Sequence, residues 1–465
     1  MIFNLENISP LRIAAKDSHG NSIKYGDITE LASNINKCIT QRSLIFILTE
    51  NNVGGIAWTI SSILSGHVPL ILNAHIDPQL LNKLIQIYQP THICEPTSQT
   101  QNINSSVINN YGYTLYKTGF DNYQMFPELS HLLPTSGSTG SPKLIRHKYS
   151  NIEAAALNIS TLFRLTERDR PLMVLPIYYT MGLSIIFSHL KVGATILITD
   201  CKMTDPLFWK FFKEEKATSF TGVPFSYEIL DKMRFYRMNL PSLNLLTQGG
   251  GKMSEDLNLK FVNYCLQSGK RWIATYGQSE GTARMAWLPE EYSLSKIGSI
   301  GIAVPNGQLS LIDPDGNEIV ESPAFGEMCY TGKNVTMGYA EHRDDLKKGD
   351  ERHGFLKTGD LAYRDKDGFY FIKGRMGRFI KLYGNRIGLD ECEILLKSKL
   401  TCDCACMGND NEIIVYVTDF QQANKATQTL METVNLPANV ITIRHIVTIP
   451  KNETGKTLYS KLENI

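Results

Sequence analysis

A chain of 465 residues exceeds what one hydrophobic core usually serves, so we expect two or more domains. Its 42% hydrophobic and 20% charged residues are typical of a globular protein, and a formal net charge of +1 argues against nucleic acid as a partner. The sequence does not begin with a basic segment followed by an apolar run, and it has no apolar stretch long enough to cross a bilayer. We therefore expect a cytoplasmic protein with no membrane span, whose nine cysteines are reduced thiols.

Apolar strand patterns alternate with amphipathic helix patterns over the first half of the chain. Apolar strands separated by helices predict a mostly parallel sheet covered on both faces, and hence the α/β class. Helices are predicted at 28–40, 55–66, 80–88, 182–190 and 208–216, and strands at 43–50, 68–74, 170–177, 194–199, 217–224 and 243–251.

Beyond Lys296 the pattern changes to short strands and turns, which predicts a smaller β-rich unit at 309–374. A second change falls at the Gly- and Arg-rich segment GRMGR, after which the chain is typical of a compact α+β domain. We expect a large N-terminal domain over residues 1–372, a hinge at 373–378 and a small C-terminal domain over 379–465.

The segment LLPTSGSTGSPKLIRH, residues 132–147, predicts a phosphate-binding loop. Small residues let backbone N–H groups approach an oligophosphate, the hydroxyls add donors, and Lys143 supplies a mobile positive charge. A flexible Ser/Gly-rich linker is the alternative. The loop is not the standard P-loop, because two residues separate Gly140 from Lys143.

Other candidate residues follow predicted strands or lie in loops. Gly249, Gly250 and Gly251 end an apolar strand and would let a flat ligand approach, although a plain turn explains them equally well. In TYGQSEGTARM, Tyr276 could stack on a base, Ser279 could bond phosphate and Glu280 could hold Mg²⁺, or the segment could simply connect a strand to a helix. Asp360 could bond ribose hydroxyls with Arg375 close in sequence, and Lys456 could lie at a loop tip.

Taken in order, these motifs resemble the adenylate-forming superfamily of acyl-CoA synthetases, firefly luciferase and nonribosomal-peptide adenylation domains. The resemblance spans nearly the whole chain. Within the superfamily, the sequence is also similar to bacterial stand-alone acyl or aminoacyl ligases. It implies that ATP with Mg²⁺ activates a carboxylic acid to an acyl-adenylate, that pyrophosphate leaves, and that the acyl group passes to a thiol. The acceptor would be coenzyme A or the phosphopantetheine of a carrier protein in trans. The motifs are TSGSTGSPK, QGGG, TYGQSEG, TGDLAYRDKDGF, GRMGRFIKLYGNRI and NETGK.

The resemblance also implies a role for each matching residue. Lys456 would bridge the substrate carboxylate and the α-phosphate, Ser279 would contact the α-phosphate and Glu280 would bind Mg²⁺. The β- and γ-phosphates would be held by Thr135, Ser136, Gly137, Ser138, Thr139, Gly140 and Lys143, and the adenine and ribose by Gly249, Gly250, Gly251, Tyr276, Gly277, Asp360 and Arg375.

Two positions depart from the superfamily's usual pattern. Gly377 stands where the hinge residue is usually Asp or Lys, and Tyr179 stands where many relatives have His and amino-acid-activating domains usually have Asp. A neutral acyl pocket is therefore expected from Tyr178, Tyr179, Phe225 and Met285, and a thiol-transfer loop containing Gly384 and Arg386. The alternatives are an amino-acid adenylating ligase that loads a carrier protein and a non-catalytic nucleotide-binding regulatory protein.

Overall fold

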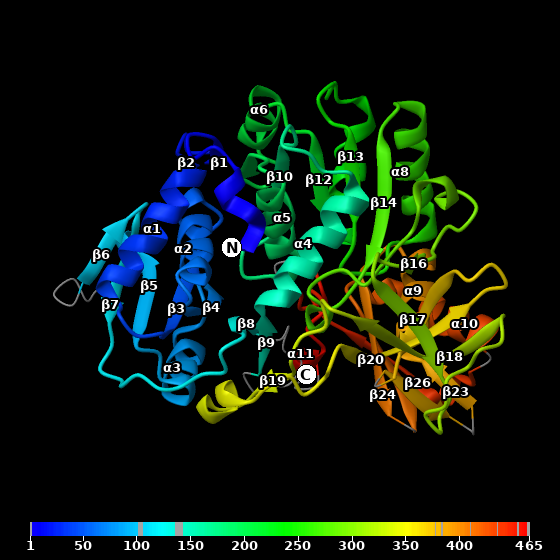
Figure 1. Ribbon diagram of the computed structural model, residues 1–465. Coiled ribbons are helices and arrows are strands. Elements are labelled where there is room, and N and C mark those ends of the chain that lie inside the picture. The colour runs from blue at the N-terminus through cyan, green and yellow to red at the C-terminus, as the bar shows by residue number, and fades with distance from the viewer. Residues whose placement is uncertain are drawn as a thin grey trace.

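The computed structural model describes residues 2–100, 106–134, 143–376, 378–382, 385–409, 411–434, 436–452 and 455–462. Two large β-sheets with covering helices come first, and smaller sheets follow toward the C-terminus (Figure 1). This arrangement confirms the predicted α/β class. Within the described ranges, no helix is long and apolar enough to cross a bilayer.

Parallel strands form the centre of the first large sheet, and antiparallel strands complete both of its edges. Over the described residues the strand order is β19-β9-β8-β4-β3-β5-β7-β6. Successive residues of β3 point to opposite faces, so Phe46 and Ile47 pack into different core clusters. The strands are β3 (Leu44–Thr49), β4 (Val68–Asn73), β5 (His92–Pro96), β6 (Ser106–Asn110), β7 (Tyr113–Lys117), β8 (Leu129–Pro134), β9 (Leu144–Lys148) and β19 (Tyr339–Ala340).

The second large sheet is parallel from β1 to β14 and antiparallel at its ends. Its order over the described residues is β16-β15-β14-β13-β12-β10-β11-β1-β2. The strands are β1 (Ile13–Asp17), β2 (Ser22–Lys24), β10 (Pro171–Met173), β11 (Ile196–Ile198), β12 (Ser219–Gly222), β13 (Leu245–Gln248), β14 (Arg271–Tyr276), β15 (Ala286–Trp287) and β16 (Ile302–Ala303).

Helices fill the space between the two large sheets and cover their outer faces. One core cluster joins α1 (Tyr25–Cys38), α2 (Val53–Leu64), α4 (Tyr149–Phe163) and α5 (Thr180–Lys191) to strands of both sheets. The helix α3 (Pro78–Tyr88) covers the outer face of the first sheet. The outer face of the second is covered by α6 (Pro206–Glu214), α7 (Pro224–Lys232) and α8 (Glu255–Gln267).

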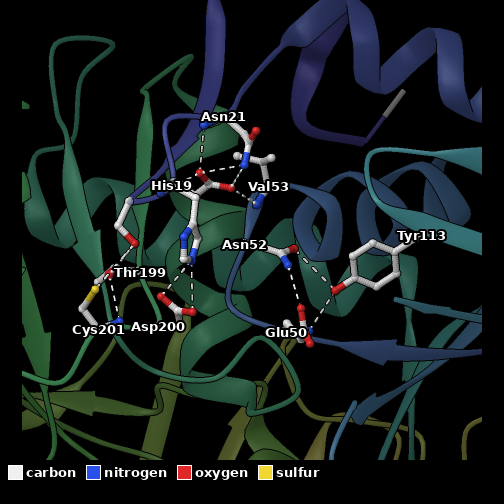
Figure 2. A network of polar contacts seen from close by, with 11 residues as sticks. His19, Asn21, Glu50, Asn52, Val53, Tyr113, Thr199, Asp200 and Cys201 are labelled. Atoms are coloured by element: carbon white, nitrogen blue, oxygen red, sulfur yellow. Dashed lines mark hydrogen bonds and ion pairs between the residues drawn. The ribbon is translucent and has the colours of Figure 1, made fainter. Parts of the chain in front are cut away.

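A polar network fixes the two large sheets against each other at the start of α2 (Figure 2). The buried carboxylate of Asp17, at the end of β1, accepts the backbone N–H of Val53 at 3.3 Å. Asn52 accepts a backbone N–H of the first helical turn at 2.9 Å, and the Tyr113 hydroxyl accepts the N–H of Glu50 at the same distance. Asp17 and Asn52 thus satisfy N–H groups that a helix leaves unpaired at its N-terminus, and Tyr113 holds the chain that leads into it.

Smaller sheets complete the described chain. An antiparallel sheet has the order β17-β18-β20-β21, and beyond it one antiparallel pair and the sheet β24-β25-β26 pack with short helices. Their strands are β17 (Gly307–Ile312), β18 (Ala324–Gly332), β20 (Phe355–Arg364), β21 (Tyr370–Arg375), β22 (Phe379–Leu382), β23 (Asn385–Gly388), β24 (Cys404–Asn409), β25 (Glu412–Val417) and β26 (Ile441–His445), and their helices are α9 (Leu389–Lys399), α10 (Ala423–Val434) and α11 (Tyr459–Leu462).

Candidate active site

The segment after β14 folds back on itself at the carboxyl end of the second sheet. Gly277 has no room for a side chain, because a Cβ atom there would lie 1.7 Å from the carbonyl oxygen of Ala283. The short turn η5 (Ser279–Gly281) follows and contains Glu280. The buried amide of Asn334 donates to two carbonyl oxygens of this segment, at 2.7 and 3.0 Å. The loop is therefore held in one conformation by tight packing and by hydrogen bonds.

Asp360, on β20, gathers three side chains around a buried carboxylate. One of its oxygens accepts the Tyr276 hydroxyl and, at 3.0 Å, the Gln278 amide, while the other lies 3.0 Å from Nε of Arg375. Burial and the neighbouring Asp360 raise the pKa of Tyr276 above its ordinary value, so its hydroxyl stays protonated. The structure thus brings together three of the residues predicted to bind adenine and ribose.

Glu280 points toward the edge of the first sheet, where its Oε1 accepts the Tyr339 hydroxyl at 2.7 Å. The guanidinium of Arg352 lies 4.6 Å from the Tyr339 ring centroid, and Nζ of Lys143 lies 5.5 Å from it. Lys143 also pairs with Glu341 at 2.8 Å. Lys143, the last residue of the predicted phosphate loop, and Glu280, the predicted Mg²⁺ ligand, therefore lie close to the same side chain, that of Tyr339.

The donors present fit a magnesium ion that arrives with ATP. The Glu280 carboxylate provides the hard oxygen that Mg²⁺ prefers. Among the described residues, no group of three or more His, Cys, Asp or Glu could hold a metal by itself. Because Mg²⁺ is commonly bound by one or two carboxylates together with substrate phosphates, a single carboxylate beside a phosphate site is a suitable arrangement.

A loop near the C-terminus reaches the same region. Gly455 has φ 77°, and a Cβ atom on it would lie 2.7 Å from Cβ of Phe225, at the start of α7. The next backbone N–H, that of Lys456, donates to Oδ1 of Asn452 at 2.9 Å. The loop that carries Lys456 is thus closed on itself and seated against the large N-terminal part of the chain.

The pKa of the Lys456 amine is affected by charged residues of the site. Desolvation lowers its pKa, Arg375 lowers it further, and the carboxylates of Asp360 and Glu280 act in the opposite direction. Lys456 nevertheless stays exposed, so a ligand in the site could reach its ammonium group. Four residues predicted from separate motifs therefore lie close enough to influence one another.

The three glycines after β13 allow close packing against two helices. A Cβ on Gly249 would lie 2.7 Å from Oγ1 of Thr275 and 3.1 Å from Cε of Met181. Gly250 has φ 77°, a backbone conformation that favours glycine. A Cβ on Gly251 would lie 3.2 Å from Cγ of Pro224.

The chain just before α5 supplies two of the four predicted acyl-pocket residues, Tyr178 and Tyr179. The rings of Tyr178 and Tyr179 lie 4.9 Å apart, and Thr180 donates to Oγ of Ser279 at 2.8 Å. Phe225 is 40% exposed and can contact a ligand, whereas Met285 is fully buried in a core cluster. Met285 therefore has no exposed surface in this structure, and its place in the acyl pocket stays a prediction.

Several predicted residues lie outside the described ones, and their roles stay predictions. These are Thr135, Ser136, Gly137, Ser138, Thr139, Gly140, Gly377 and Gly384, together with the side chain of Arg386.

Gln278, Tyr339 and Thr180 contact predicted site residues but were not predicted from the sequence. Thr180 directly follows the predicted pocket residue Tyr179 and lies just before the helix predicted at 182–190, so its position gave a usable signal. Tyr339 lies 59 residues beyond Glu280, and no spacing rule connects the two.

A family model and several curated proteins match part of this chain. Residues 126–340 match the AMP-binding enzyme family. Oxalate–CoA ligase from Arabidopsis thaliana is 31% identical over 270 residues, 57% of this chain and 51% of its own length. 2-Succinylbenzoate–CoA ligase from Geobacillus sp. (strain WCH70) is 29% identical over 297 residues, 63% of this chain and 58% of its own length. The chain thus spans a little over half the length of the curated relatives it matches.

Solved structures share the whole fold. O-succinylbenzoate coenzyme A synthetase from Bacillus subtilis, in complex with AMP, superposes with a TM-score of 0.80 over 99% of this chain and 97% of its own, at 20% identity. ATP-bound MatB from Rhodopseudomonas palustris gives a TM-score of 0.78 over 100% of this chain and 99% of its own, at 19% identity. The fold is therefore one that holds adenine nucleotides in these proteins. The match of residues 126–340 to the AMP-binding enzyme family confirms the predicted resemblance to the adenylate-forming superfamily over that part of the chain.

Proposed function

We propose that the chain is an ATP-dependent acid–thiol ligase. It would activate a carboxylic acid as an acyl-adenylate, release pyrophosphate and transfer the acyl group to a thiol. The observation that carries the proposal is the convergence of Lys456, from the C-terminal loop, on Asp360, Arg375 and Glu280.

The nucleoside of ATP fits beside Asp360. A buried carboxylate can accept both ribose hydroxyls, and Arg375, whose Nε lies 3.0 Å from Asp360, holds that carboxylate in one orientation. Tyr276, fixed through its hydroxyl, would present its ring to adenine, with Gly277 and the glycines Gly249, Gly250 and Gly251 around the base.

The phosphates would extend from there toward Lys143. Ser279, positioned by Thr180, would contact the α-phosphate, while Lys143 and the preceding loop would hold the β- and γ-phosphates. Glu280 would hold Mg²⁺, which when bound neutralises phosphate charge.

The chemical step brings two anions together. An oxygen of the substrate carboxylate attacks the α-phosphorus, a new P–O bond forms, and the bond to pyrophosphate breaks. Lys456 placed between the two anions offsets their repulsion and binds more strongly as charge develops around the phosphorus. Loss of one such group typically slows a reaction by about a hundred- to a thousandfold.

We propose coenzyme A as the acceptor, since the curated relatives are CoA ligases. A carrier-protein phosphopantetheine in trans is the second choice. Transfer would use the loop with Gly384 and Arg386 after residues 379–465 turn about Gly377 relative to residues 1–372. We place the reaction in the cytoplasm, a reducing compartment that suits nine free thiols.

Acid-dependent exchange of pyrophosphate into ATP tests the proposal without an acceptor. The panel should contain fatty, hydroxy, aromatic, amino and dicarboxylic acids, and Lys456→Ala should be measured beside Lys461→Ala, an exposed lysine on α11. We expect exchange with at least one acid, lost in Lys456→Ala and kept in Lys461→Ala. Exchange with amino acids alone would favour an amino-acid ligase, and ATP binding without exchange would favour a non-catalytic protein.

A further inference from the structure

Arg284 is a buried cation with an incomplete set of partners. The residue is 3% exposed, yet among the described residues only its Nη1 has a hydrogen-bond partner, the hydroxyl of Ser184. Its Nε and Nη2 are buried and have no hydrogen-bond partner in the part of the chain that the structure describes. The guanidinium lies 5.2 Å from the ring centroid of Phe163, which offers no full negative charge. Burial lowers the pKa of Arg284 to about 10, so it is still charged at neutral pH.

Another buried arginine shows what a complete set of partners looks like. The side chain of Arg146 is fully buried, but it pairs with Glu351 and donates to backbone carbonyls, including those of Tyr339 at 3.0 Å and Gly349 at 3.2 Å. A buried cation with these partners stabilises a fold, whereas one without a carboxylate opposes folding. Arg284 therefore calls for an explanation other than packing.

The position of Arg284 relates it to the proposed reaction. Thr180 on α5 bonds Ser279, the proposed α-phosphate contact, and Ser184 on the same helix bonds Arg284. Residues four apart lie on one face of a helix, about 6 Å apart along its axis. Arg284 thus lies about one helical turn deeper along α5 than the point where the substrate carboxylate would be activated.

We propose that Arg284 binds a second carboxylate of the acid substrate, and that the enzyme activates short dicarboxylic acids. The inference rests on the proposed function. Nε and Nη2 form one edge of the guanidinium, and that edge matches the two oxygens of a carboxylate in a bidentate pair. Both curated relatives described above are named for acids that carry two carboxylates, oxalate and 2-succinylbenzoate.

Pairs of acids of equal length test this assignment. Each dicarboxylic acid is compared with the monocarboxylic acid that has a methyl group in place of its second carboxylate. We expect wild type to favour the diacid, and Arg284→Met to lower kcat/KM for the diacid by about a hundredfold while changing that of the monoacid little. The KM for ATP should not change, and Arg284→Lys should recover only part of the loss because it cannot form the bidentate pair.

Thermal unfolding separates this role from a structural one. Arg284→Met should keep or raise the Tm because it removes an unpaired buried charge, whereas Arg146→Met should lower it. Without ATP, the favoured diacid should raise the Tm of wild type and not that of Arg284→Met.

Each outcome decides a separate question. Equal use of diacids and monoacids, or an equal loss of both in Arg284→Met, would overturn the inference and leave the proposed function standing. A fall in Tm as large as that of Arg146→Met would make Arg284 structural and overturn the inference as well. If no acid supports exchange, the proposed function fails, and a diacid-dependent Tm shift decides whether the carboxylate site exists.

Discussion

Gly455→Ala should slow adenylation by disturbing the seat of the Lys456 loop. Gly455 has φ 77°, and this left-handed conformation costs an alanine about 1–2 kcal/mol. The new Cβ would also lie 2.7 Å from Cβ of Phe225, well inside ordinary contact distance. The conformational cost alone corresponds to a roughly 5- to 30-fold slower reaction, since about 1.36 kcal/mol is tenfold in rate. The contact adds to it.

Pyrophosphate exchange at saturating ATP and acid measures the effect. Phe225→Gly removes the Cβ that makes this contact but leaves the backbone conformation of residue 455 unchanged, so Gly455→Ala with Phe225→Gly should recover part of the rate and no more. The Tm should stay close to that of wild type, because the loop is outside the core clusters. Unchanged exchange in Gly455→Ala, at any Tm, would refute the argument that this loop must sit against Phe225 for catalysis.

Three further predictions concern single groups of the site. Because the pKa of Lys456 is lowered from 10.5, its amine loses its proton at a lower pH than an ordinary lysine, and exchange should fall as the pH rises past that pKa. In a pH–rate profile, Lys456→Arg should move this alkaline fall to higher pH. Tyr339→Phe removes the 2.7 Å hydrogen bond to Glu280, about 1 kcal/mol, and should change the Mg²⁺ concentration for half-maximal exchange several-fold. Gly277→Ala places a Cβ 1.7 Å from a carbonyl oxygen and should lower the Tm and abolish exchange, whereas Gly119→Ala, with no atom within 4 Å, should do neither.

Local patterns predicted the centre of each large sheet but not the edges. The apolar run that forms β3 is buried on both faces of the sheet. A strand covered on both faces has apolar residues at successive positions, and such a continuous apolar run is recognisable in a sequence. The short strand β1 pairs with β11, and β19, of two residues, pairs with β9. These pairings join segments about 180 to 195 residues apart, so no local periodicity in the sequence predicts them.

In the site, too, residues within local motifs were predicted and the path of the chain between them was not. Glu280, Asp360, Arg375 and Lys456 were predicted because each lies in a motif with its own residue pattern. Met285 was expected in the acyl pocket, but Thr282 and Ala283 adopt positive φ values of 47° and 78°, and beyond this turn Met285 is buried in a core cluster. Positive φ at residues other than glycine is uncommon and cannot be predicted from the amino-acid sequence alone.

Arg284 was missed for a different reason. A single arginine after a loop matches no pattern, and only the packed structure shows that its Nε and Nη2 are buried without partners. If the proposal holds, the acyl pocket expected from Tyr178 and Tyr179 also contains a positive charge further along α5.

A net charge of +1 for the chain conceals a local excess of positive charge in the site. Of the charged residues assigned here to the proposed site, five are cations and three are carboxylates, and Arg375 lowers the pKa of Lys456. Under the proposed function, the phosphates of ATP and a carboxylate bring the negative charge that offsets this repulsion. ATP binding should therefore favour the protonated form of Lys456 and strengthen the seating of its loop, so that the catalytic amine is charged when the two anions meet. The residues counted are Lys143, Arg284, Arg352, Arg375 and Lys456 against Glu280, Glu341 and Asp360.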